Sequence, residues 1–583
     1  VNNGATVTIN TKTGSGITTI TVNTGGTLIL GSNVNNTLNV TLAGGTLKIL
    51  GGTSASIGTL LQSAASTVDM DSSTSSFATL TVATLTPVTY AMTVSNWTNG
   101  SDHLYATAVT GSPSKNTSNI APLNVITLGS NAATQTYWAT TTELLAGASG
   151  GNTYWDGPNT SPNSLVDGGT STWNSVTSNW TDSAGALNGT WAGGTAVATF
   201  QGTAGTVTVS GTQSIGGLTF NTTGYTLTGG TALSLAQDST ITTASGVSAT
   251  LNSPISGSYG LTFTGGGQIT FGGTNSYIGN TTVDAGTVII DNKVNCNAAN
   301  ICPIGRGEVI INSGATLQGG SGTSTAENPL GVPSFNVGAT KVTVRGTLKM
   351  LPTLNANMPS IVLDGGELAS TSPSATPSGS APSWGIFVLG DGVQVLQNST
   401  ISSPYVTNNQ AGGTVYTVAS GATLNVTGYF CKPTSITDTG FILTGGGSMV
   451  FSSATDNTAV GAITVTNGTL QVGNGSTGGS ISSHASVALS STSSNLIFNR
   501  SNAYSFGKVI SGTGNVSQNG SGTTTLSGTN TYTGTTTVNA GTLAYGSASG
   551  VPAASAVSAL ASTTLDVNSQ AVTRTASTTV NGT

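Results

Sequence analysis

One stretch of this chain is written twice, and this repeat constrains the fold more than any other feature of the sequence. Residues 255–288 and 510–543 align without a gap, and 17 of the 34 positions are identical. Both copies contain Gly-Thr-Asn-x-Tyr-x-Gly, followed by x-Thr-Thr-Val or Thr-Thr-Thr-Val and then a closing Ala-Gly-Thr turn. A unit of this size cannot bury an apolar face alone, so it predicts one element of a stacked array.

The residues inside the repeat predict short strands joined by sharp corners. In the second copy, Thr524 and Leu526 and then Thr536 and Val538 alternate with small polar residues, which is the period of a β-strand. Glycine and asparagine separate these runs, and both tolerate the positive φ of tight turns. We therefore expect an all-β fold, a right-handed parallel β-helix or β-solenoid, with a Trp-rich non-repetitive segment near the N-terminal third.

Weaker copies of the unit extend the array along the chain. A third copy at residues 440–473 keeps Phe451 and the closing turn at residues 467–470, with a two-residue insertion in the middle. The closing Gly-Thr-Leu also recurs after 19 residues, from Gly26 to Gly45. A step of this length is a sensible perimeter for one coil of a solenoid.

The repeated residues resemble the autotransporter-associated β-strand repeat of bacterial surface proteins. The resemblance is specific over the two full copies and weaker over the third, and it covers roughly residues 150–550. The segments around Trp155, Trp173 and Trp180 are similar to the aromatic entry segment that precedes such repeats. The resemblance implies a secreted bacterial protein with a right-handed β-helix. It implies little about a ligand, because the family is defined by a structural unit.

The chain is unusually poor in charged residues. They make up 5% of the 583 residues, against about 25% in ordinary soluble domains. The formal net charge is −6, and the sequence has no basic patch that would bind nucleic acid. It also lacks a run of about 18 apolar residues, so no membrane span is predicted. The whole chain has only 12 lysines and arginines. Charged residues on strand edges prevent pairing with other chains, so with so few of them we expect the chain to associate with copies of itself. The alternative is a neutral surface with capped solenoid ends.

Changes in composition divide the chain into four predicted segments. Residues 1–95 are a β-rich segment, either solenoid coils or a small sandwich, and residues 96–200 are an aromatic-rich insertion or cap. Residues 201–550 are the main solenoid, and residues 551–583 are a C-terminal tail with a strand that could dock onto another subunit. The chain starts without a leader, so we expect an extracellular or cell-surface protein whose secretion signal has been removed.

Tryptophan is concentrated in one part of the sequence. Two interpretations stay open for these rings: they cap the solenoid, or they form a docking surface for glycans or for another copy of the chain. The candidate docking or ligand aromatics are Trp97, Trp138, Trp155, Trp173, Trp180 and Trp191.

The three cysteines suggest one disulfide. Cys296 and Cys302 bracket a short loop that a disulfide would close in an oxidising exterior, and the alternative is a pair of buried thiols. Cys431 is then left either buried or available for a bond to another chain.

No group of residues predicts catalysis, a metal site or a cofactor. Arg345 and Asp364 are nearly one coil apart, so we expect them to stack and form a surface ion pair, the alternative being a catalytic arginine with its carboxylate. Asp69 and Asp71 lack the glycines and glutamate of a calcium loop, and we expect two exposed turn residues. Two isolated histidines predict neither a triad nor a metal centre.

The favoured hypothesis is a secreted structural surface protein that is not an enzyme. It would assemble with copies of itself into an extracellular filament or surface layer, because the repeated residues are strand and corner residues without reactive groups. The second hypothesis is an adhesin passenger whose solenoid is a stalk and whose Trp-rich segment binds host or matrix glycans. A polysaccharide-degrading β-helix enzyme is a minor third hypothesis.

Overall fold

A computed structural model describes the strands of the chain and many of their connections. The described residues are 1–12, 16–34, 37–71, 78–86, 92–96, 103–109, 126–128, 136–138, 143–146, 152–186, 188–291, 304–320, 341–350, 356–358, 360–370, 387–389, 392–403, 406–408, 410–428, 430, 438–454 and 459–581. Every regular element within these residues is a β-strand, which confirms the all-β prediction. None of the described residues belongs to a helix long and apolar enough to span a membrane.

The chain divides into two compact units. The first comprises Val1–Asp167 and Ser175–Ala192, and the second comprises Gly168–Asn174 and Gly193–Thr583.

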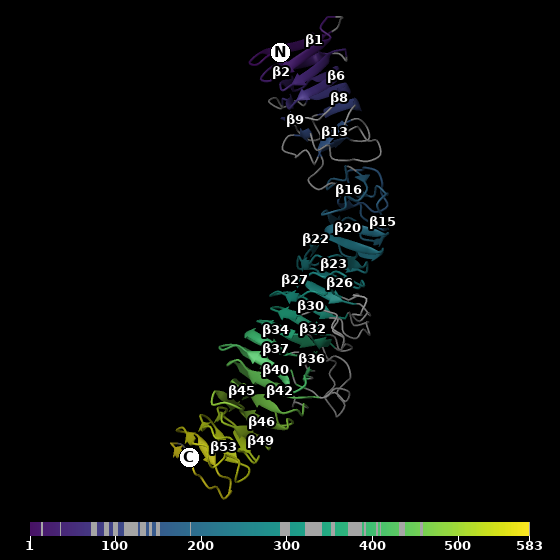
Figure 1. The fold of residues 1–583 in the computed structure, drawn as a ribbon. Coiled ribbons are helices and arrows are strands. Elements are labelled where there is room, and N and C mark those ends of the chain that lie inside the picture. Colours follow the sequence, from purple (N-terminus) through teal and green to yellow (C-terminus); the bar gives the residue numbers. More distant parts are fainter. Residues whose placement is uncertain are drawn as a thin grey trace. The chain divides into compact units, whose positions relative to one another are not determined.

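Two parallel sheets build the N-terminal coils of the first unit (Figure 1). One sheet consists of β1 (Thr6–Lys12), β3 (Thr27–Val34), β5 (Thr46–Ile49), β7 (Ser66–Asp69), β9 (Met92–Ser95) and β11 (Ile126–Leu128). The other consists of β2 (Thr19–Asn23), β4 (Asn39–Ala43), β6 (Ser54–Ala64), β8 (Thr79–Thr86) and β10 (His103–Val109), followed by β13 (Glu143–Ala146) and β12 (Thr136–Trp138), which pair antiparallel. Odd and even strands alternate between the sheets, so each coil contributes one strand to each, and the coils continue past residue 95.

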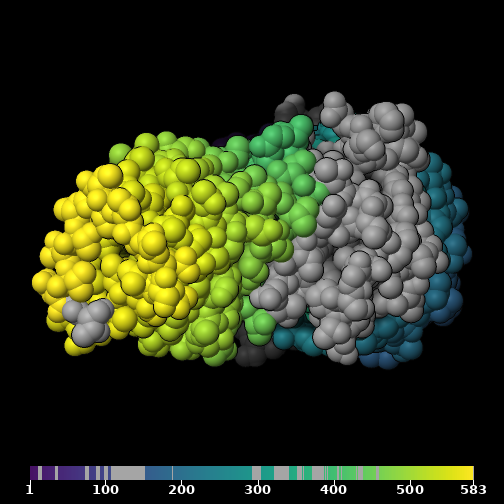
Figure 2. Space-filling model, turned by 90° about the horizontal axis from the view of Figure 1, so that it is seen from below, coloured from purple at the N-terminus to yellow at the C-terminus, as the bar shows by residue number. Residues whose placement is uncertain are grey.

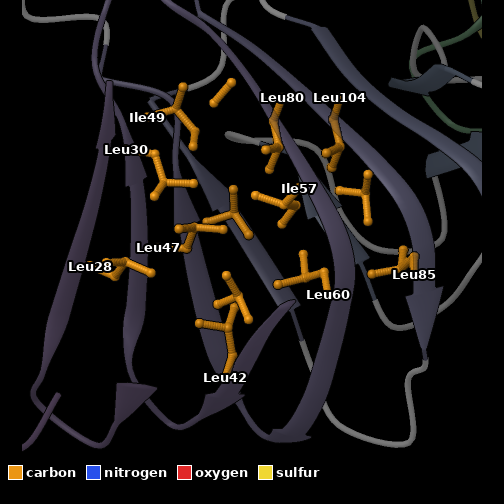
Figure 3. Close-up of a cluster of buried hydrophobic side chains, with 14 of the residues drawn as sticks. Leu28, Leu30, Leu42, Leu47, Ile49, Ile57, Leu60, Leu80, Leu85 and Leu104 are labelled. Carbon is orange, nitrogen blue, oxygen red and sulfur yellow. The ribbon is translucent and has the colours of Figure 1, made fainter. Parts of the chain in front are cut away.

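The core of these coils is a set of stacked aliphatic side chains (Figure 3). Leu28 of β3 lies beside Leu47 of β5, which lies beside Val68 of β7, and all three are fully buried. Thr27 and Thr46 precede these leucines and stack in the neighbouring column. The period-2 alternation therefore sends apolar residues inward on every coil, and each buried leucine contributes about 1.5–3 kcal/mol.

Two long parallel sheets build the second unit (Figure 1). Within this unit, the first long sheet consists of β18 (Val197–Phe200), β20 (Thr212–Phe220), β22 (Ala232–Thr243), β24 (Ile255–Ser256), β25 (Leu261–Thr264), β27 (Thr281–Val283), β29 (Val309–Ile311), β31 (Lys341–Val344), β34 (Ser360–Asp364), β37 (Val393–Gln397), β40 (Thr414–Val418), β42 (Phe441–Thr444), β44 (Ile463–Val465), β46 (Ser486–Leu489) and β49 (Val509–Gly512).

The second long sheet has 18 strands in the described part of the chain. They are β15 (Ser171–Trp173), β19 (Thr206–Val209), β21 (Thr226–Gly229), β23 (Ser248–Leu251), β26 (Gln268–Phe271), β28 (Thr287–Ile290), β30 (Thr316–Gly319), β32 (Thr347–Met350), β35 (Glu367–Ser370), β38 (Ser399–Ile401), β41 (Thr423–Val426), β43 (Ser448–Phe451), β45 (Gly468–Val472), β47 (Ser494–Phe498), β50 (Asn515–Gln518), β52 (Thr536–Val538), β54 (Val557–Ala559) and β56 (Thr578–Val580). At about 4.8 Å per strand, this ladder is about 80 Å long.

Shorter sheets occur in two parts of the same unit. One consists of β33 (Ala356–Met358), β36 (Phe387–Leu389) and β39 (Val406–Asn408), and the other of β48 (Tyr504–Phe506), β51 (Thr523–Leu526), β53 (Thr542–Tyr545) and β55 (Thr564–Asp566). Parallel strands stacked coil upon coil confirm the β-solenoid prediction.

The copies of the repeat do not all occupy the same sheets. In the copies at 255–288 and 440–473, β25 and β42 lie in the first long sheet and β26 and β43 in the second. In the copy at 510–543, the equivalent strands β50 and β51 lie in the second long sheet and in the short sheet. One unit therefore fits different sides of the solenoid.

The segment after residue 550 continues the coils. In β54, Val557 pairs with Thr578 of β56, and β54 itself pairs with β52. The last strand, which the sequence offered as a strand for docking onto another subunit, therefore pairs within its own chain. The yellow atoms in Figure 2 show these last coils packed into one continuous body.

Candidate functional site

Three tryptophans of the first unit pack against one another in the protein interior. Trp155 of β14 (Tyr154–Trp155) pairs with Trp180 of β16 (Trp180–Thr181) in an antiparallel ladder. Their ring centroids are 5.1 Å apart, and the centroids of Trp180 and Trp191 are 4.5 Å apart. Trp155 and Trp180 are fully buried, and Trp191 is 8% exposed. Such pairs stabilise a core, and buried rings have no free face on which a sugar could stack.

A buried carboxylate holds the loops around this tryptophan cluster. Asp156 accepts hydrogen bonds from the backbone N–H of Asp167 at 2.8 Å and from Nδ2 of Asn188, in β17 (Asn188–Gly189), at 2.7 Å. Asn159 and Asn163 in turn donate to Oδ2 of Asp167, at 2.9 and 2.7 Å. Burial raises the pKa of Asp156, and the hydrogen bonds that it accepts oppose this rise. The carboxylates of Asp156 and Asp167 thus receive hydrogen bonds from neighbouring groups of the same cluster.

The remaining predicted aromatics and cysteines are distributed differently. Trp173 belongs to the second unit, where it is fully buried with its ring centroid 6.1 Å from that of Phe200. Trp138 ends β12, but its side chain lies outside the described residues, as do Trp97, Cys296 and Cys302. The disulfide stays a prediction, and four of the six candidate rings are core residues.

The asparagine of the repeat is a buried structural residue in both full copies. Oδ1 of Asn275 accepts the backbone N–H of Ile255 at 2.8 Å, and Oδ1 of Asn530 accepts that of Ile510 at 2.8 Å. Nδ2 of Asn530 also donates to the carbonyl of Gly550 at 2.6 Å. Each asparagine thereby satisfies backbone groups of neighbouring coils that corner geometry leaves without a ladder partner.

The tyrosine of the repeat is buried beside a threonine in both full copies. Tyr277 Oη lies 2.7 Å from Thr281 Oγ1, and Tyr532 Oη lies 2.7 Å from Thr536 Oγ1. Burial raises the pKa of Tyr277 to about 12. The phenol is therefore neutral and hydrogen-bonds to a neighbouring hydroxyl at the corner of the coil. This contact is structural and includes no catalytic group.

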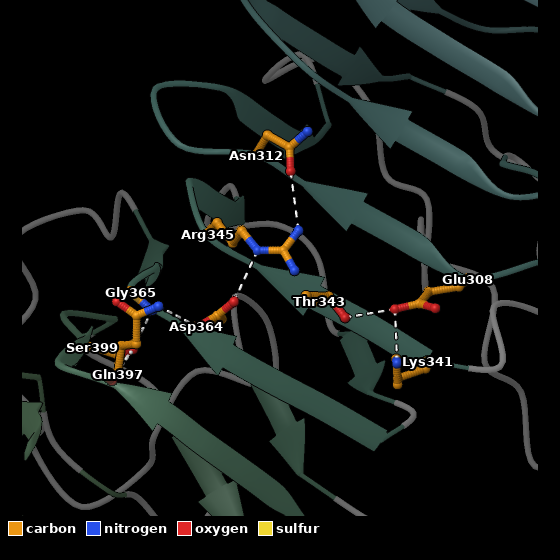
Figure 4. A network of polar contacts seen from close by, with 9 residues as sticks. All are labelled: Glu308, Asn312, Lys341, Thr343, Arg345, Asp364, Gly365, Gln397 and Ser399. Atoms are coloured by element: carbon orange, nitrogen blue, oxygen red, sulfur yellow. Dashed lines mark hydrogen bonds and ion pairs between the residues drawn. The ribbon is translucent and has the colours of Figure 1, made fainter. Parts of the chain in front are cut away.

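A ladder of polar side chains runs across five successive strands of the first long sheet, and Figure 4 draws all of its members except Asp284. Each member ends a strand or directly follows one, and the members are Asp284, Asn312, Arg345, Asp364 and Gln397. Arg345 Nε lies 2.9 Å from Asp364 Oδ2, which confirms the predicted ion pair. Asn312 joins Asp284 at 2.8 Å and Arg345 at 3.2 Å, and Gln397 donates to Asp364 Oδ1 at 2.9 Å. Each of these side chains has its partner on a neighbouring coil, so we interpret the ladder as a structural link between coils.

We expect Arg345→Met to lower the free energy of unfolding by less than about 1 kcal/mol, because exposed ion pairs contribute little. The Arg345 side chain is 44% exposed, so salt should shrink the effect further. Urea unfolding at low and high salt measures both. A loss of several kcal/mol that is independent of salt would contradict a surface role.

The Asp-x-Asp pair differs from its prediction of two exposed turn residues. Asp71 is only 7% exposed. Nζ of Lys48, on a neighbouring coil, lies 3.1 Å from Asp71 and 3.7 Å from Asp69. Hydrogen bonding to Asp71 raises the pKa of Lys48. The pair is therefore an intercoil ion-pair site, and among the described residues no group of three or more His, Cys, Asp or Glu side chains is arranged to hold a metal ion.

One of the two histidines is buried in the second unit. His484 is fully buried, its Nδ1 lies 2.7 Å from the carbonyl of Gly461, and its ring packs edge-on against Phe441. Burial lowers its pKa below the ordinary value of 6.5. The unfolded chain then binds a proton more readily than the folded one, so folding loses stability as pH falls below that ordinary value.

We therefore expect the wild-type chain to lose unfolding free energy as the pH falls below about 6.5, where the unfolded histidine takes up a proton and the folded one does not. The slope from this residue should reach at most about 1.4 kcal/mol per pH unit. In His484→Leu, urea unfolding across this range should show a flatter dependence. An unchanged slope in the variant would assign the pH dependence to other groups.

Three segments of the chain match the passenger-associated-transport-repeat family, at residues 261–290, 441–472 and 516–544. Each segment overlaps one of the three repeats found in the sequence, and none extends more than two residues beyond its repeat. The predicted resemblance is therefore confirmed. The chain is also similar to the adhesin BmaC autotransporter of Brucella suis biovar 1 (strain 1330), with 39% identity over 129 residues. That alignment covers 22% of this chain and 4% of the relative, so the chain spans a small part of the relative's length. No solved structure matches the chain.

Proposed function

We propose that this chain, which carries three passenger-associated-transport-repeats, is a stalk-forming part of an extracellular adhesin passenger of the autotransporter type. The observation that carries the proposal is the coincidence of these repeats with the stacked coils of the second unit. The similarity to an autotransporter adhesin supports it and favours adhesion over the filament that composition alone suggested.

The stalk role follows from how the coils are held. Within the long sheets, interior strands hydrogen-bond to a strand on either side, so bending requires many ladder bonds to distort together. The 18 strands of the second long sheet would hold an attached surface about 80 Å from the start of the ladder. A charge content of 5% leaves little long-range repulsion against a cell surface.

Recognition would be carried by connections of unequal length between the two long sheets. Residues 272–280 join β26 to β27, whereas residues 291–308 join β28 to β29 and residues 320–340 join β30 to β31. In each case the strand before the connection lies in the second long sheet and the strand after it lies in the first. Insertions on one side of a repeat array are a common binding surface.

Bead attachment tests this proposal. Beads coated with the full chain should attach to mammalian cell monolayers and to matrix-coated wells better than beads coated with albumin. Replacing residues 320–340 by the shorter connection 272–280 should reduce attachment while the thermal unfolding midpoint stays close to wild type. The adhesin proposal would be overturned if wild-type beads attached to none of these surfaces better than albumin beads do.

Self-association into a filament or surface layer is a second candidate function. The small number of charged residues favours it, because uncharged strand edges pair readily. Sedimentation velocity over a concentration series, with negative-stain microscopy of the highest concentration, should then show polymers. A monomer throughout the series would rule this candidate out.

A further inference from the structure

One aromatic ring of the second unit points away from the core. Tyr259 lies between β24 and β25 and is 45% exposed. Among the described large hydrophobic residues that are exposed, it is the one aromatic. Ile278, on the next coil, is 55% exposed. The exposed ring stands out in a chain of which only 5% is aromatic.

The backbone of neighbouring coils is closely stacked at this corner. A Cβ on Gly279 would lie 2.3 Å from the carbonyl carbon of Tyr259. A Cβ on Gly260 would lie 3.0 Å from the carbonyl oxygen of Asn280. Glycines thus allow neighbouring coils to approach closely, and the side chain of Tyr259 is left on the outside of the corner.

The internal repeat shows that the fold does not require this ring. The copies at 255–288 and 510–543 share their buried asparagine and tyrosine, yet Gly514 occupies the position of Tyr259 and Thr533 that of Ile278. Directly before the copy at 440–473, Thr439 occupies the position that corresponds to Tyr259. Coils of the same architecture form without an aromatic here, so packing does not account for Tyr259.

Polar atoms with spare hydrogen-bonding capacity flank the tyrosine. Oδ1 of Asp238 accepts the backbone N–H of Gly260 at 2.7 Å, and Oδ1 of Asn280 accepts that of Glu308 at 3.0 Å. Both side chains are exposed. Within the described part of the chain, this leaves Oδ2 of Asp238 as an acceptor and Nδ2 of Asn280 as a donor, on coils on either side of the tyrosine.

We propose that Tyr259 is the stacking platform of a saccharide-binding site, with Asp238 and Asn280 hydrogen-bonding the sugar hydroxyls. The ligand class is a neutral β-linked oligosaccharide, whose equatorial substituents leave flat C–H faces for an aromatic ring. An acceptor and a donor on the coils before and after the tyrosine match a sugar, because each sugar residue both donates and accepts hydrogen bonds. The proposal rests on the proposed adhesin function and names a ligand class for it.

An oligosaccharide array tests the site with the full chain. The probes are immobilised β-linked oligomers of glucose, galactose and N-acetylglucosamine, with α-linked dextran as the contrast. We expect the wild type to bind at least one β-linked probe, and Tyr259→Ala to lose about tenfold or more of that binding, as truncation of an interface anchor does. Tyr259→Phe should keep most of it, because the ring face remains.

A matched control separates the site from general surface effects. Leu396 is also 45% exposed, and Leu396→Ala should bind the probes like the wild type. Failure of the wild type to bind any β-linked probe, or full binding by Tyr259→Ala, would overturn the proposal. Beads that still attach to cells with Tyr259→Ala would leave the adhesin function standing without this site. If wild-type beads attached to no surface, the adhesin proposal would be rejected. The array would still test whether Tyr259 binds a saccharide.

Discussion

Replacing Asn530 by leucine is expected to lower the unfolding free energy of the second unit by about 2–6 kcal/mol, since an unsatisfied buried polar group costs about 1–3 kcal/mol. Leucine has a similar size, so the change removes hydrogen bonds without opening a large cavity. The N–H of Ile510 and the carbonyl of Gly550 would both lose their side-chain partner. Asn530 is only 4% exposed, so water could not readily replace it. Urea unfolding followed by circular dichroism measures the loss.

Asn539 provides the control for this prediction. Its Nδ2 donates to Oδ1 of Asn519 at 2.8 Å on the exposed surface of the same unit. Asn539→Ala should stay within about 0.5 kcal/mol of wild type, as surface substitutions usually do. Hydrogen exchange should place the weakened coils of the Asn530 variant around residues 510–550, because neighbouring coils depend on one another. Equal stability of the two variants would show that the repeat asparagine is not the intercoil tie that its contacts indicate.

Truncating Trp180 to alanine is expected to cost the first unit about 3–5 kcal/mol, the usual range for removing a large buried aromatic. Trp180 is fully buried between Trp155 and Trp191, and its pair contacts add about 0.5–1.5 kcal/mol each. The variant should unfold at a lower urea concentration, with faster hydrogen exchange in residues 152–167 and 175–192.

This second prediction separates a core role for the tryptophans from a docking role. Leu165 lies in the same unit and is 60% exposed, so Leu165→Ala should change stability by less than about 0.5 kcal/mol. If Trp180→Ala kept wild-type stability but lost attachment to a surface, the tryptophans would be ligand residues, and their packing in the interior would need another explanation.

The sequence was most informative where local patterns decide structure. Alternation at period 2 in residues such as Thr524 and Leu526 depends only on neighbours in the chain, and it correctly predicted strands. The pairing of Arg345 with Asp364 was also predictable, because residues one coil apart must stack once the perimeter is known.

Sequence reasoning was least informative where exposure depends on distant residues. It left the tryptophans as either a cap or a docking surface, and Trp155 and Trp180 are buried by contacts between segments that only folding brings together. Asp71 was expected on the surface, but Lys48 reaches it across the coils. Tyr259 drew no notice in the sequence. A comparison of the two copies could have found it, since it is an aromatic residue at a position where the other copy has glycine.

The sequence by itself determined the repeating unit: strands from period-2 alternation, corners from glycine and asparagine, and the asparagine and tyrosine that recur in both copies. Those features are local, so they survive wherever the unit is placed. Tertiary structure alone decided which side of the solenoid each unit occupies, with β25 in the first long sheet and its equivalent β50 in the second. The physical reason is that the strand register of each coil is set by the coil on which it stacks, and the lengths of the intervening connections vary.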